Sequence, residues 1–222
     1  MPTSRYDPHT SWYDEFASTE PFARLREHAV GLLGPGPGRC LDLGCGTGLA
    51  LALLDEAGWT ATGVDASVAQ LALARQRAPR IELLQADAHS LPFDDESFDA
   101  VITILTHTDF DDAARVLREA ARVLENGGVL VYAGVHPCFG SPFAEPLDDG
   151  TTLLHPGYRR VGWETVSRDP DNPGIRSRVG VNHIPLSRLI AGVLDVGLRL
   201  TAFDEPGERD PPLFLSLRAE KR

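Results

Sequence analysis

A glycine-rich turn directly after a short apolar run is the feature that most constrains how this chain can fold. Residues 39–43 form a β-type run, and Gly44, Gly46 and Gly48 follow it before an amphipathic stretch. Glycine lacks a Cβ, so the backbone can turn sharply there and a ligand can lie against it. A strand, a glycine turn and a helix in this order are typical of nucleotide-type cofactor sites on parallel α/β sheets. Leu49 stands where the dinucleotide fingerprint requires its third glycine, so the turn departs from that fingerprint.

Two aspartates stand at the ends of later β-type runs. Asp65 closes the run at 60–64, and Asp87 lies near the end of the run at 81–88. A carboxylate at the tip of a second strand can accept hydrogen bonds from both hydroxyls of a ribose. A carboxylate at the tip of a third strand can accept a hydrogen bond from an exocyclic amine. The glycine turn and the two aspartates therefore predict one cofactor site at a single edge of the sheet.

Strand and helix patterns alternate through the first two thirds of the chain. Further strands are expected at 98–104 and 129–135, and helices at 21–33, 49–57, 67–78 and 111–125. An amphipathic helix at 185–196 precedes two runs at 198–203 and 213–217, which predict an antiparallel hairpin at the sheet edge. The pattern predicts an α/β fold with a mostly parallel seven-stranded, Rossmann-like sheet and helices on both faces.

The length of 222 residues fits a single domain over residues 1–222. We expect an N-terminal cap and helix in 1–38, a cofactor-binding core in 39–135 and a last helix with the terminal hairpin in 184–222. Residues 136–183 combine prolines, glycines and aromatic residues after the fifth strand. Long segments of this kind inside a compact domain are often functional, so we expect a substrate lid there.

Composition restricts the class of partner. Twenty-one basic and 32 acidic residues give a net charge of −11, which disfavours nucleic acid because phosphate neutralisation supplies most of that affinity. No apolar run approaches a membrane span and no signal peptide opens the chain, so we expect a cytoplasmic protein without a membrane partner. The three cysteines lack zinc spacing, so no metal site is predicted and reduced thiols are expected. A monomer and a homodimer are both compatible with the sequence.

Four segments together resemble one family. They are LDLGCGTG at 41–48, GVDAS at 63–67, QADAHSLPFDDESFDAVI at 85–102 and RVLENGGVLVYAG at 122–134. This set resembles the class I S-adenosylmethionine-dependent methyltransferases, and among them the small-molecule branch that includes the quinone-biosynthesis methyltransferases. Glu125 and Asn126 depart from the Lys or Arg and Pro that the family usually carries before the double glycine, which affects a helix end rather than the cofactor site. The resemblance implies methyl transfer from S-adenosyl-L-methionine to a small-molecule substrate, with O- or C-methylation by in-line displacement and S-adenosyl-L-homocysteine as product.

The resemblance and the residues together predict the cofactor contacts. The expected set is Asp42, Gly44, Cys45, Gly46, Asp65, Ala66, Asp87, Ala88, Thr103, Ile104 and Tyr13. Asp65 is expected on the ribose, Asp87 with the Ala88 amide on the adenine, and the carbonyls of Thr103 and Ile104 on the ammonium side.

Asp42 and Tyr13 have further expected roles at the cofactor site. Asp42 is expected either to hold the ammonium, directly or through water, or merely to cap the turn, and both interpretations stay open. Tyr13 belongs to a Tyr-Asp pair that family members carry near the N-terminus, and it is expected to cover the cofactor.

Three histidines are candidates for the general base that an oxygen or carbon nucleophile needs. His107 follows the fourth strand, His136 follows the fifth, and His183 leads into the last helix. His136 is the first candidate, because Pro137 restricts its backbone to an extended form, and His107 is the second. Each of them, taken alone, also fits a structural hydrogen bonder.

Two alternatives come from other functional classes. A nicotinamide-dependent oxidoreductase is disfavoured by Leu49 in place of the third glycine and by the terminal hairpin. A non-catalytic cofactor-binding module is disfavoured by the intact turn combined with a long aromatic lid, although the sequence alone does not exclude it.

Overall fold

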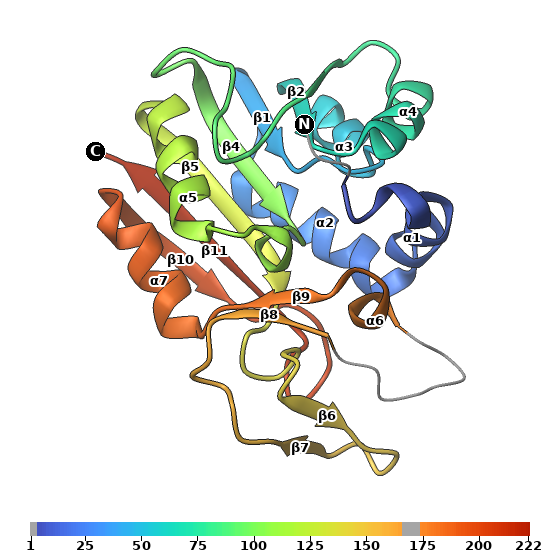
Figure 1. Ribbon diagram of the computed structural model, residues 1–222. Helices are drawn as coiled ribbons and strands as arrows, with labels where there is room; N and C mark the ends of the chain where they lie inside the picture. The colour runs from blue at the N-terminus through green and yellow to red at the C-terminus, as the bar shows by residue number, and fades with distance from the viewer. Residues whose placement is uncertain (1–3, 166–173) are drawn as a thin grey trace.

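One seven-stranded sheet organises the molecule, as the computed structural model shows for residues 4–165 and 174–222 (Figure 1). The strand order is β10-β11-β5-β4-β1-β2-β3. The strands are β1 (Arg39–Leu43), β2 (Thr60–Asp65), β3 (Glu82–Gln85), β4 (Phe98–Ile104), β5 (Leu124–Val135), β10 (Leu198–Asp204) and β11 (Phe214–Lys221). Strands β1 to β5 are parallel, and β11 runs antiparallel to both β5 and β10. The expected mostly parallel sheet with an antiparallel terminal hairpin is confirmed.

The chain enters the sheet at a central strand, β1, and this strand order creates a topological switch point. The chain runs outward from β1 to β3 and then returns to β4 on the other side of β1. In open α/β sheets, ligands bind outside the carboxyl ends of the strands at this topological switch point. The glycine turn after β1 lies at the switch point.

Helices cover both faces of the sheet (Figure 1). On one face lie α2 (Glu20–Leu33), α3 (Leu51–Glu56) and α4 (Val68–Arg77), and on the other lie α5 (Ala113–Val123) and α7 (Leu186–Asp195). Side chains of β5 alternate between the two cores: Leu130 packs into the core under α5 and α7, and Val131 into the core under α2 and α3. This alternation follows from the two-residue period of a strand that is buried on both faces.

The segment expected to form a lid contains regular structure. It holds the hairpin β6 (Ala144–Pro146) with β7 (Thr152–Leu154), the pair β8 (Gly162–Glu164) with β9 (Val181–His183), and α6 (Ile175–Val179). These elements lie beyond the carboxyl ends of β4 and β5 (Figure 1). Residues 166–173 of this segment, with Arg168 among them, lie outside the described residues. Two further short elements, η1 (Asp7–His9) with α1 (Thr10–Ala17) and η2 (His107–Asp109), lie near the same ends.

Several predicted boundaries are wrong, among them the start of β5 at Leu124 rather than at residue 129 and the end of β11 at Lys221 rather than at residue 217. The third strand ends at Gln85 rather than at residue 88, because the Asp87 carboxylate accepts hydrogen bonds from the backbone and ring of His89 and forms a turn. The helix expected at 111–125 ends at Val123, because Leu124 already pairs with Phe98 in the sheet. Glu125 and Asn126 therefore belong to β5 and not to a helix end.

The predicted start of α4 is confirmed. The Ser67 hydroxyl accepts a hydrogen bond from the backbone N–H of Gln70 at 3.1 Å. A serine in this place satisfies one of the free N–H groups of the first helical turn.

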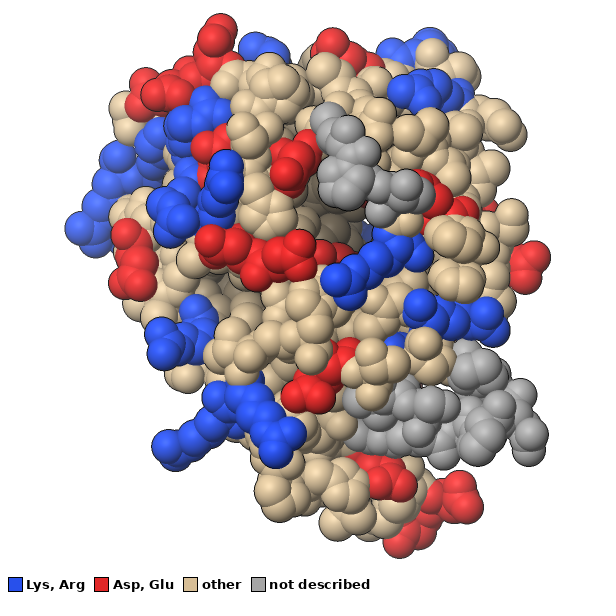
Figure 2. Space-filling model, in the orientation of Figure 1, with Lys and Arg blue, Asp and Glu red and all other residues tan. Residues whose placement is uncertain are grey.

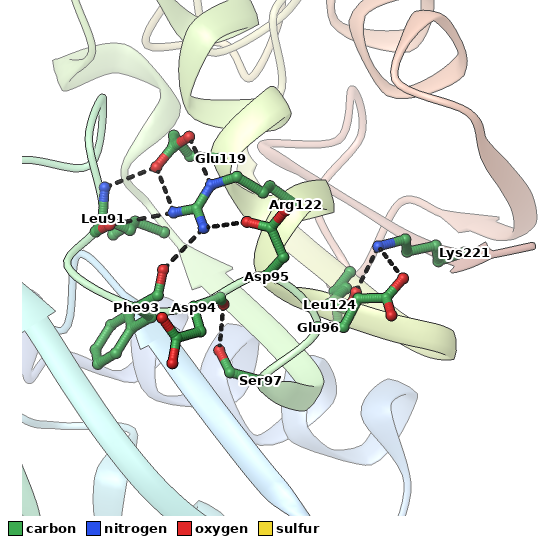
Figure 3. A network of polar contacts seen from close by, with 10 residues as sticks. All are labelled: Leu91, Phe93, Asp94, Asp95, Glu96, Ser97, Glu119, Arg122, Leu124 and Lys221. Carbon is green, nitrogen blue, oxygen red and sulfur yellow. Dashed lines mark hydrogen bonds and ion pairs between the residues drawn. The ribbon is translucent and has the colours of Figure 1, made fainter.

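A polar network fastens the loop before β4 to α5 (Figure 3). The Arg122 guanidinium donates to the carboxylates of Glu119 and Asp95, and to the carbonyls of Leu91 and Phe93. Lys221 at the end of β11 donates to the Leu124 carbonyl at 2.6 Å. The loop and the chain end are thus held by groups that α5 and β5 supply.

Charge is mixed on the molecular surface. Figure 2 shows acidic and basic side chains interspersed on one face.

Among the described residues, no helix has both the length and the apolar character needed to cross a bilayer. Within residues 4–165 and 174–222, no three His, Cys, Asp or Glu side chains are grouped so as to bind a metal ion.

The buried strand β11 gives a test of the fold. Leu217 is completely buried between β5 and β10, whereas Leu194 on α7 is 50% exposed. We predict that Leu217→Ala lowers the free energy of unfolding by about 2–5 kcal/mol, because it leaves a cavity in a packed core. Leu194→Ala, the same chemical change on the surface, is expected to stay within about 0.5 kcal/mol. Urea denaturation of both variants measures the difference, and equal losses would contradict the assigned packing.

Candidate active site

The glycine turn is held against the ends of two neighbouring strands. The N–H groups of Gly44 and Cys45 both donate to the Val64 carbonyl at 2.9 Å, which ties the turn to β2. Gly44 has a φ of +80°, and a Cβ on it would lie 2.5 Å from the Thr106 methyl group beyond β4. Only glycine satisfies both the backbone angle and the close approach. The local sequence therefore fixes the turn at the switch point.

A small cavity, here called the turn cavity, lies over this turn and has a volume of about 40 Å³. Its lining residues are Tyr13, Ala17, Arg26, Asp42, Gly44, Cys45, Gly46, Thr47, Leu49, Ala50, Ile104 and Leu105. Six residues expected at the cofactor site from the sequence are among them: Tyr13, Asp42, Gly44, Cys45, Gly46 and Ile104. Pockets for small molecules typically measure roughly 300–1,000 Å³, so the turn cavity accounts for only a part of a site of cofactor size.

Asp42 is the most unusual group in the turn cavity. It is 2% exposed, and its Oδ2 has no hydrogen-bond partner within the described part of the chain. Burial, with a further contribution from nearby Asp65, raises the pKa of the Asp42 carboxyl to about 7. A buried carboxylate without a partner costs free energy and favours the approach of a cation.

Asp65 lies next to Asp42 on the neighbouring strand but is hydrogen-bonded. Its Oδ2 accepts from the Gly46 N–H at 2.9 Å, and its Oδ1 accepts from the Ser67 N–H at 2.8 Å. Burial raises the pKa of Asp65, while these backbone hydrogen bonds act in the opposite direction. The carboxylate is therefore held in one orientation beside the turn and keeps further lone pairs for a ligand.

Arg26 supplies a cation that the sequence analysis missed. It lies on the buried face of α2, is 7% exposed, and donates from Nη1 to the Ala17 carbonyl at 2.7 Å. Burial lowers the pKa of its guanidinium. Arg26 lies on the apolar face of the helix expected at 21–33. This position could have identified it from the sequence, because arginine is rarely buried unless its charge has a partner. The turn cavity thus has a carboxylate and a guanidinium in its walls.

The N-terminal segment closes the turn cavity through polar contacts. Asp14 on α1 accepts from the Thr47 hydroxyl at 2.5 Å and pairs with Arg77 at 3.0 Å. Asp7 accepts from the Ser67 hydroxyl at 2.5 Å. These contacts hold Tyr13 over the turn, and they tie α1 to the two loops that carry the glycines and Ser67.

The tip of β4 carries backbone strain at the same place. Leu105 has a φ of +62°, which is a left-handed conformation that side chains other than glycine seldom adopt. Its N–H donates to the Ala133 carbonyl at 2.8 Å, and its side chain lines the turn cavity. Such strain is found preferentially at functional sites, where the surrounding structure fixes it.

Five expected cofactor residues do not line the turn cavity: Asp65, Ala66, Asp87, Ala88 and Thr103. The Thr103 hydroxyl donates to the Leu43 carbonyl at 3.0 Å, inside the sheet. Ala66 and Asp87 are exposed, and Ala88 packs partly against the core. The Asp87 Oδ1 is occupied by His89, whose ring nitrogen lies 2.7 Å away. The cavity therefore includes the methionine side of the expected site but not the expected adenine contacts.

The three candidate histidines line one second cavity, here called the histidine cavity, of about 10 Å³. It also includes Arg176 of α6 and Asn182 of β9. Residues 104 and 105 line the turn cavity, while residues 107 and 108 line the histidine cavity. The single segment after β4 therefore separates the two cavities, and they are neighbours.

His136 and His107 are held by their hydrogen bonds. The His136 Nδ1 accepts from the Cys138 N–H at 3.0 Å, so its Nε2 carries the proton and donates to Glu205 at 2.9 Å. The His107 Nδ1 lies 2.5 Å from the Tyr132 hydroxyl, and burial lowers the pKa of His107 to about 3. His136 has no lone pair left in this conformation, and His107 stays neutral across the physiological range.

His183 has a different arrangement. Its Nε2 lies 2.7 Å from the Tyr158 carbonyl, and a carbonyl accepts only from a protonated ring nitrogen. The Nδ1 of a neutral His183 therefore keeps its lone pair. Burial lowers the pKa of His183, while the bond to Tyr158 supports the protonated ring. Of the three rings, this one has the hydrogen bonding that a general base requires.

Comparison with known protein families identifies relatives of this chain. Residues 41–132 match the family described as a methyltransferase domain. A phthiotriol/phenolphthiotriol dimycocerosates methyltransferase of Mycobacterium leprae is 40% identical over 177 residues, which cover 77% of this chain and 66% of that protein. A demethylmenaquinone methyltransferase of Thermus thermophilus is 44% identical over 121 residues, covering 51% of this chain and 55% of that protein. The chain spans between about half and two thirds of the length of such curated relatives.

Solved structures show the same fold at low sequence identity. An S-adenosylmethionine-dependent methyltransferase from Mesorhizobium loti superimposes with a TM-score of 0.73 at 22% identity, over 92% of this chain and 99% of that chain. The [4+2]-cyclase SpnF superimposes with a TM-score of 0.71 at 20% identity, over 99% of this chain and 96% of that chain. The second match indicates that this fold serves more than one reaction.

The raised pKa of Asp42 predicts a pH-dependent stability. Between about pH 4 and pH 7 the folded protein holds a proton on Asp42 that the unfolded chain releases, so the free energy of unfolding falls as the pH rises. Asp42→Asn removes this dependence. We predict that the variant is more stable than the parent at pH 8, by on the order of 2–4 kcal/mol, and nearly equal to it at pH 4.5.

Urea denaturation at the two pH values measures this effect. The matched control is Asp55→Asn on α3, where the carboxylate is exposed and the two pH values should give the same small change. An Asp42→Asn variant that is less stable than the parent at pH 8 would show that Asp42 is already satisfied in the folded protein.

Proposed function

The chain carries a class I S-adenosylmethionine-dependent methyltransferase domain, and on this premise we propose that the protein methylates an oxygen or carbon atom of a small-molecule acceptor. The observation that carries the proposal is the Asp42 carboxyl group, buried in the wall of the turn cavity, whose Oδ2 has no hydrogen-bond partner among the described residues. An enzyme that binds a cationic amino-acid group at this place gains from a carboxylate that nothing else neutralises.

The residues of the turn cavity fit the cofactor. S-adenosylmethionine has an ammonium and a carboxylate at one end and a ribose with adenine at the other. We assign Asp42 to the ammonium, Arg26 to the carboxylate and Asp65 to the ribose hydroxyls. The glycine turn lets the backbone approach the methionine part, since a Cβ on Gly46 would already lie 2.7 Å from the Gln70 side-chain oxygen.

S-adenosylmethionine supplies an electrophilic methyl carbon on a sulfonium leaving group when it is bound. The protein aligns the acceptor with that carbon, excludes water and removes a proton from the acceptor. In the balanced reaction, the acceptor atom gains the methyl group, the sulfur takes the electron pair of the broken bond, and the acceptor's proton passes to a base. S-adenosylhomocysteine is the second product.

We assign the proton transfer to His183. Its Nδ1 takes the acceptor's proton, while the Tyr158 carbonyl fixes the ring and accepts from the Nε2–H group. His107, held by Tyr132, orients the acceptor as a neutral ring, and His136 braces the lid against Glu205. This assignment differs in order from the sequence-based expectation, which placed His136 first, because the hydrogen bonds of His136 occupy both nitrogens.

The acceptor belongs in our proposal to the class of small metabolites. The relatives in Mycobacterium leprae and Thermus thermophilus are named for phthiotriol/phenolphthiotriol dimycocerosates and for demethylmenaquinone, which are neither proteins nor nucleic acids. The cysteines Cys40, Cys45 and Cys138 are free thiols, which supports a reducing compartment such as the cytoplasm.

The two charges in the turn cavity predict a selective loss of cofactor affinity. We predict that Asp42→Asn and Arg26→Gln each weaken S-adenosylhomocysteine binding by about 1.5–3 kcal/mol, because each removes a charge-assisted contact. Isothermal calorimetry measures both. Binding of 5′-methylthioadenosine, which lacks the ammonium and the carboxylate, is expected to change less than about threefold, or below about 0.7 kcal/mol.

A pH series sharpens this test. The affinity of the parent protein for S-adenosylhomocysteine should rise from pH 6 to pH 8, because the Asp42 carboxyl ionises with a pKa of about 7. Asp42→Asn should lose the rise, and 5′-methylthioadenosine should not show it. A parent protein that binds NADH more tightly than S-adenosylhomocysteine would overturn the proposed function itself.

The assignment of the base predicts unequal effects of three matched substitutions. Once a metabolite screen for S-adenosylhomocysteine release has identified an acceptor, His183→Gln should lower kcat by about 10²- to 10⁴-fold. The acidic limb of the pH–rate profile should disappear with it. His136→Gln should keep most of kcat while lowering the melting temperature, since its contacts are structural. If His136→Gln instead shows the large loss, the base is His136, as the sequence suggested.

A further inference from the structure

The histidine cavity contains a cation with an unusual environment. Arg176 of α6 lines it, and among residues 4–165 and 174–222 no carboxylate lies within the 4.0 Å of an ion pair with its guanidinium. Asp109 contributes a negative potential from further away, but its Oδ1 already accepts from the Tyr6 hydroxyl at 2.9 Å. Burial raises the pKa of Asp109 to about 7, so it supplies only part of a counter-charge.

Two other partly buried arginines, Arg122 and Arg77, are neutralised by carboxylates. Arg122 contacts two carboxylates and two carbonyls (Figure 3), and Arg77 pairs with Asp14. A guanidinium that faces a cavity without such partners is a binding element for an anion, since the planar fork of donors matches an ionised oxygen.

Asn182 provides a second and independent indication of a ligand. It is 4% exposed, its Nδ2 donates to the Phe110 carbonyl, and its Oδ1 has no partner within the described part of the chain. Buried amide oxygens are almost always hydrogen-bonded. The Asn182 Oδ1 in the cavity wall is therefore available to a donor on a ligand. Asn182 lies beside His183 on β9 and lines the same cavity as Arg176.

We propose that Arg176 and Asn182 form an acceptor-recognition site for small metabolites that carry an ionised oxygen together with a hydroxyl group. Arg176 binds the ionised oxygen, the Asn182 Oδ1 accepts from the hydroxyl, and the acceptor is thereby placed beside His183. This inference rests on the proposed methyl transfer and adds the chemical class of its acceptor. Arg176 and Asn182 are specificity-determining residues in it, because they select the acceptor rather than move its proton.

Binding of simple probes to the full-length protein saturated with S-adenosylhomocysteine tests the proposal. The probes are 3-hydroxybenzoate, its neutral amide 3-hydroxybenzamide, and benzoate, with 3-hydroxy-2-naphthoate and its amide as a larger pair. We expect each hydroxy acid to bind at least tenfold more tightly than its amide, and 3-hydroxybenzoate to bind more tightly than benzoate. Calorimetry or ligand-observed NMR gives the dissociation constants.

Two variants of α6 separate charge recognition from general effects. Arg176→Gln should abolish the preference for acid over amide, and Arg176→Lys should restore part of it. Arg178→Gln is the matched control, because the Arg178 guanidinium lies over the Trp12 ring at 4.6 Å, outside the histidine cavity, and should leave the preference unchanged.

The outcomes distinguish the inference from the function on which it rests. Unchanged S-adenosylhomocysteine binding in every variant shows that the fold and the cofactor site are intact. If that binding persists while acids and amides bind equally, or while none of the probes binds below 10 mM, on the order of −2.7 kcal/mol, the recognition site is refuted and methyl transfer is untouched. If S-adenosylhomocysteine itself fails to bind the parent protein, the proposed function is refuted first.

Discussion

Two carboxyl groups lie at the ends of adjacent strands beside the glycine turn. Asp42 on β1 and Asp65 on β2 are one residue away from the paired positions Leu43 and Val64, and both lie in a buried environment. Burial and the negative charge of Asp65 raise the pKa of Asp42, and a cation near these groups would be favoured. Asp65 is satisfied by backbone N–H groups, whereas Asp42 is not. Asp42 lines the turn cavity together with the glycine turn, Arg26 and Tyr13 of the N-terminal helix.

The topology of the sheet explains why the second cavity lies beside the first. Strand β4 returns next to β1, so the segment after β4 passes directly over the glycine turn. That segment presents Leu105 to one cavity and His107 to the other. Strand β5 and the lid then close the second cavity with His136 and His183. A group bound over the turn and a group bound among the histidines are therefore brought together by strand order alone.

Local patterns predicted most of the fold, and six of the eleven expected cofactor residues line the turn cavity. The glycine turn, the Ser67 cap and the alternation of strands and helices depend on residues close in sequence, and they are confirmed. The ends of β3 and α5 depend on contacts with His89 and Phe98, which no local pattern reports. The sequence did not single out Arg26, Arg176 or Asn182. Their interest depends on which hydrogen-bond and ion-pair partners surround each side chain in the folded protein. The hydrogen bonds that separate the three histidines likewise come from residues 2 to 69 positions away.

The closed N-terminal segment has a kinetic consequence. The contacts of Asp14 with Thr47 and Arg77, and of Asp7 with Ser67, must separate before a molecule of cofactor size reaches the turn cavity. We expect exchange of product for fresh cofactor to require local unfolding of residues 4–17, which costs the free energy of these contacts. The Arg77 and Asp14 side chains retain partial contact with solvent, so salt screens their attraction. Turnover under saturating conditions would then depend on ionic strength through the opening of a helix rather than through the chemistry beneath it.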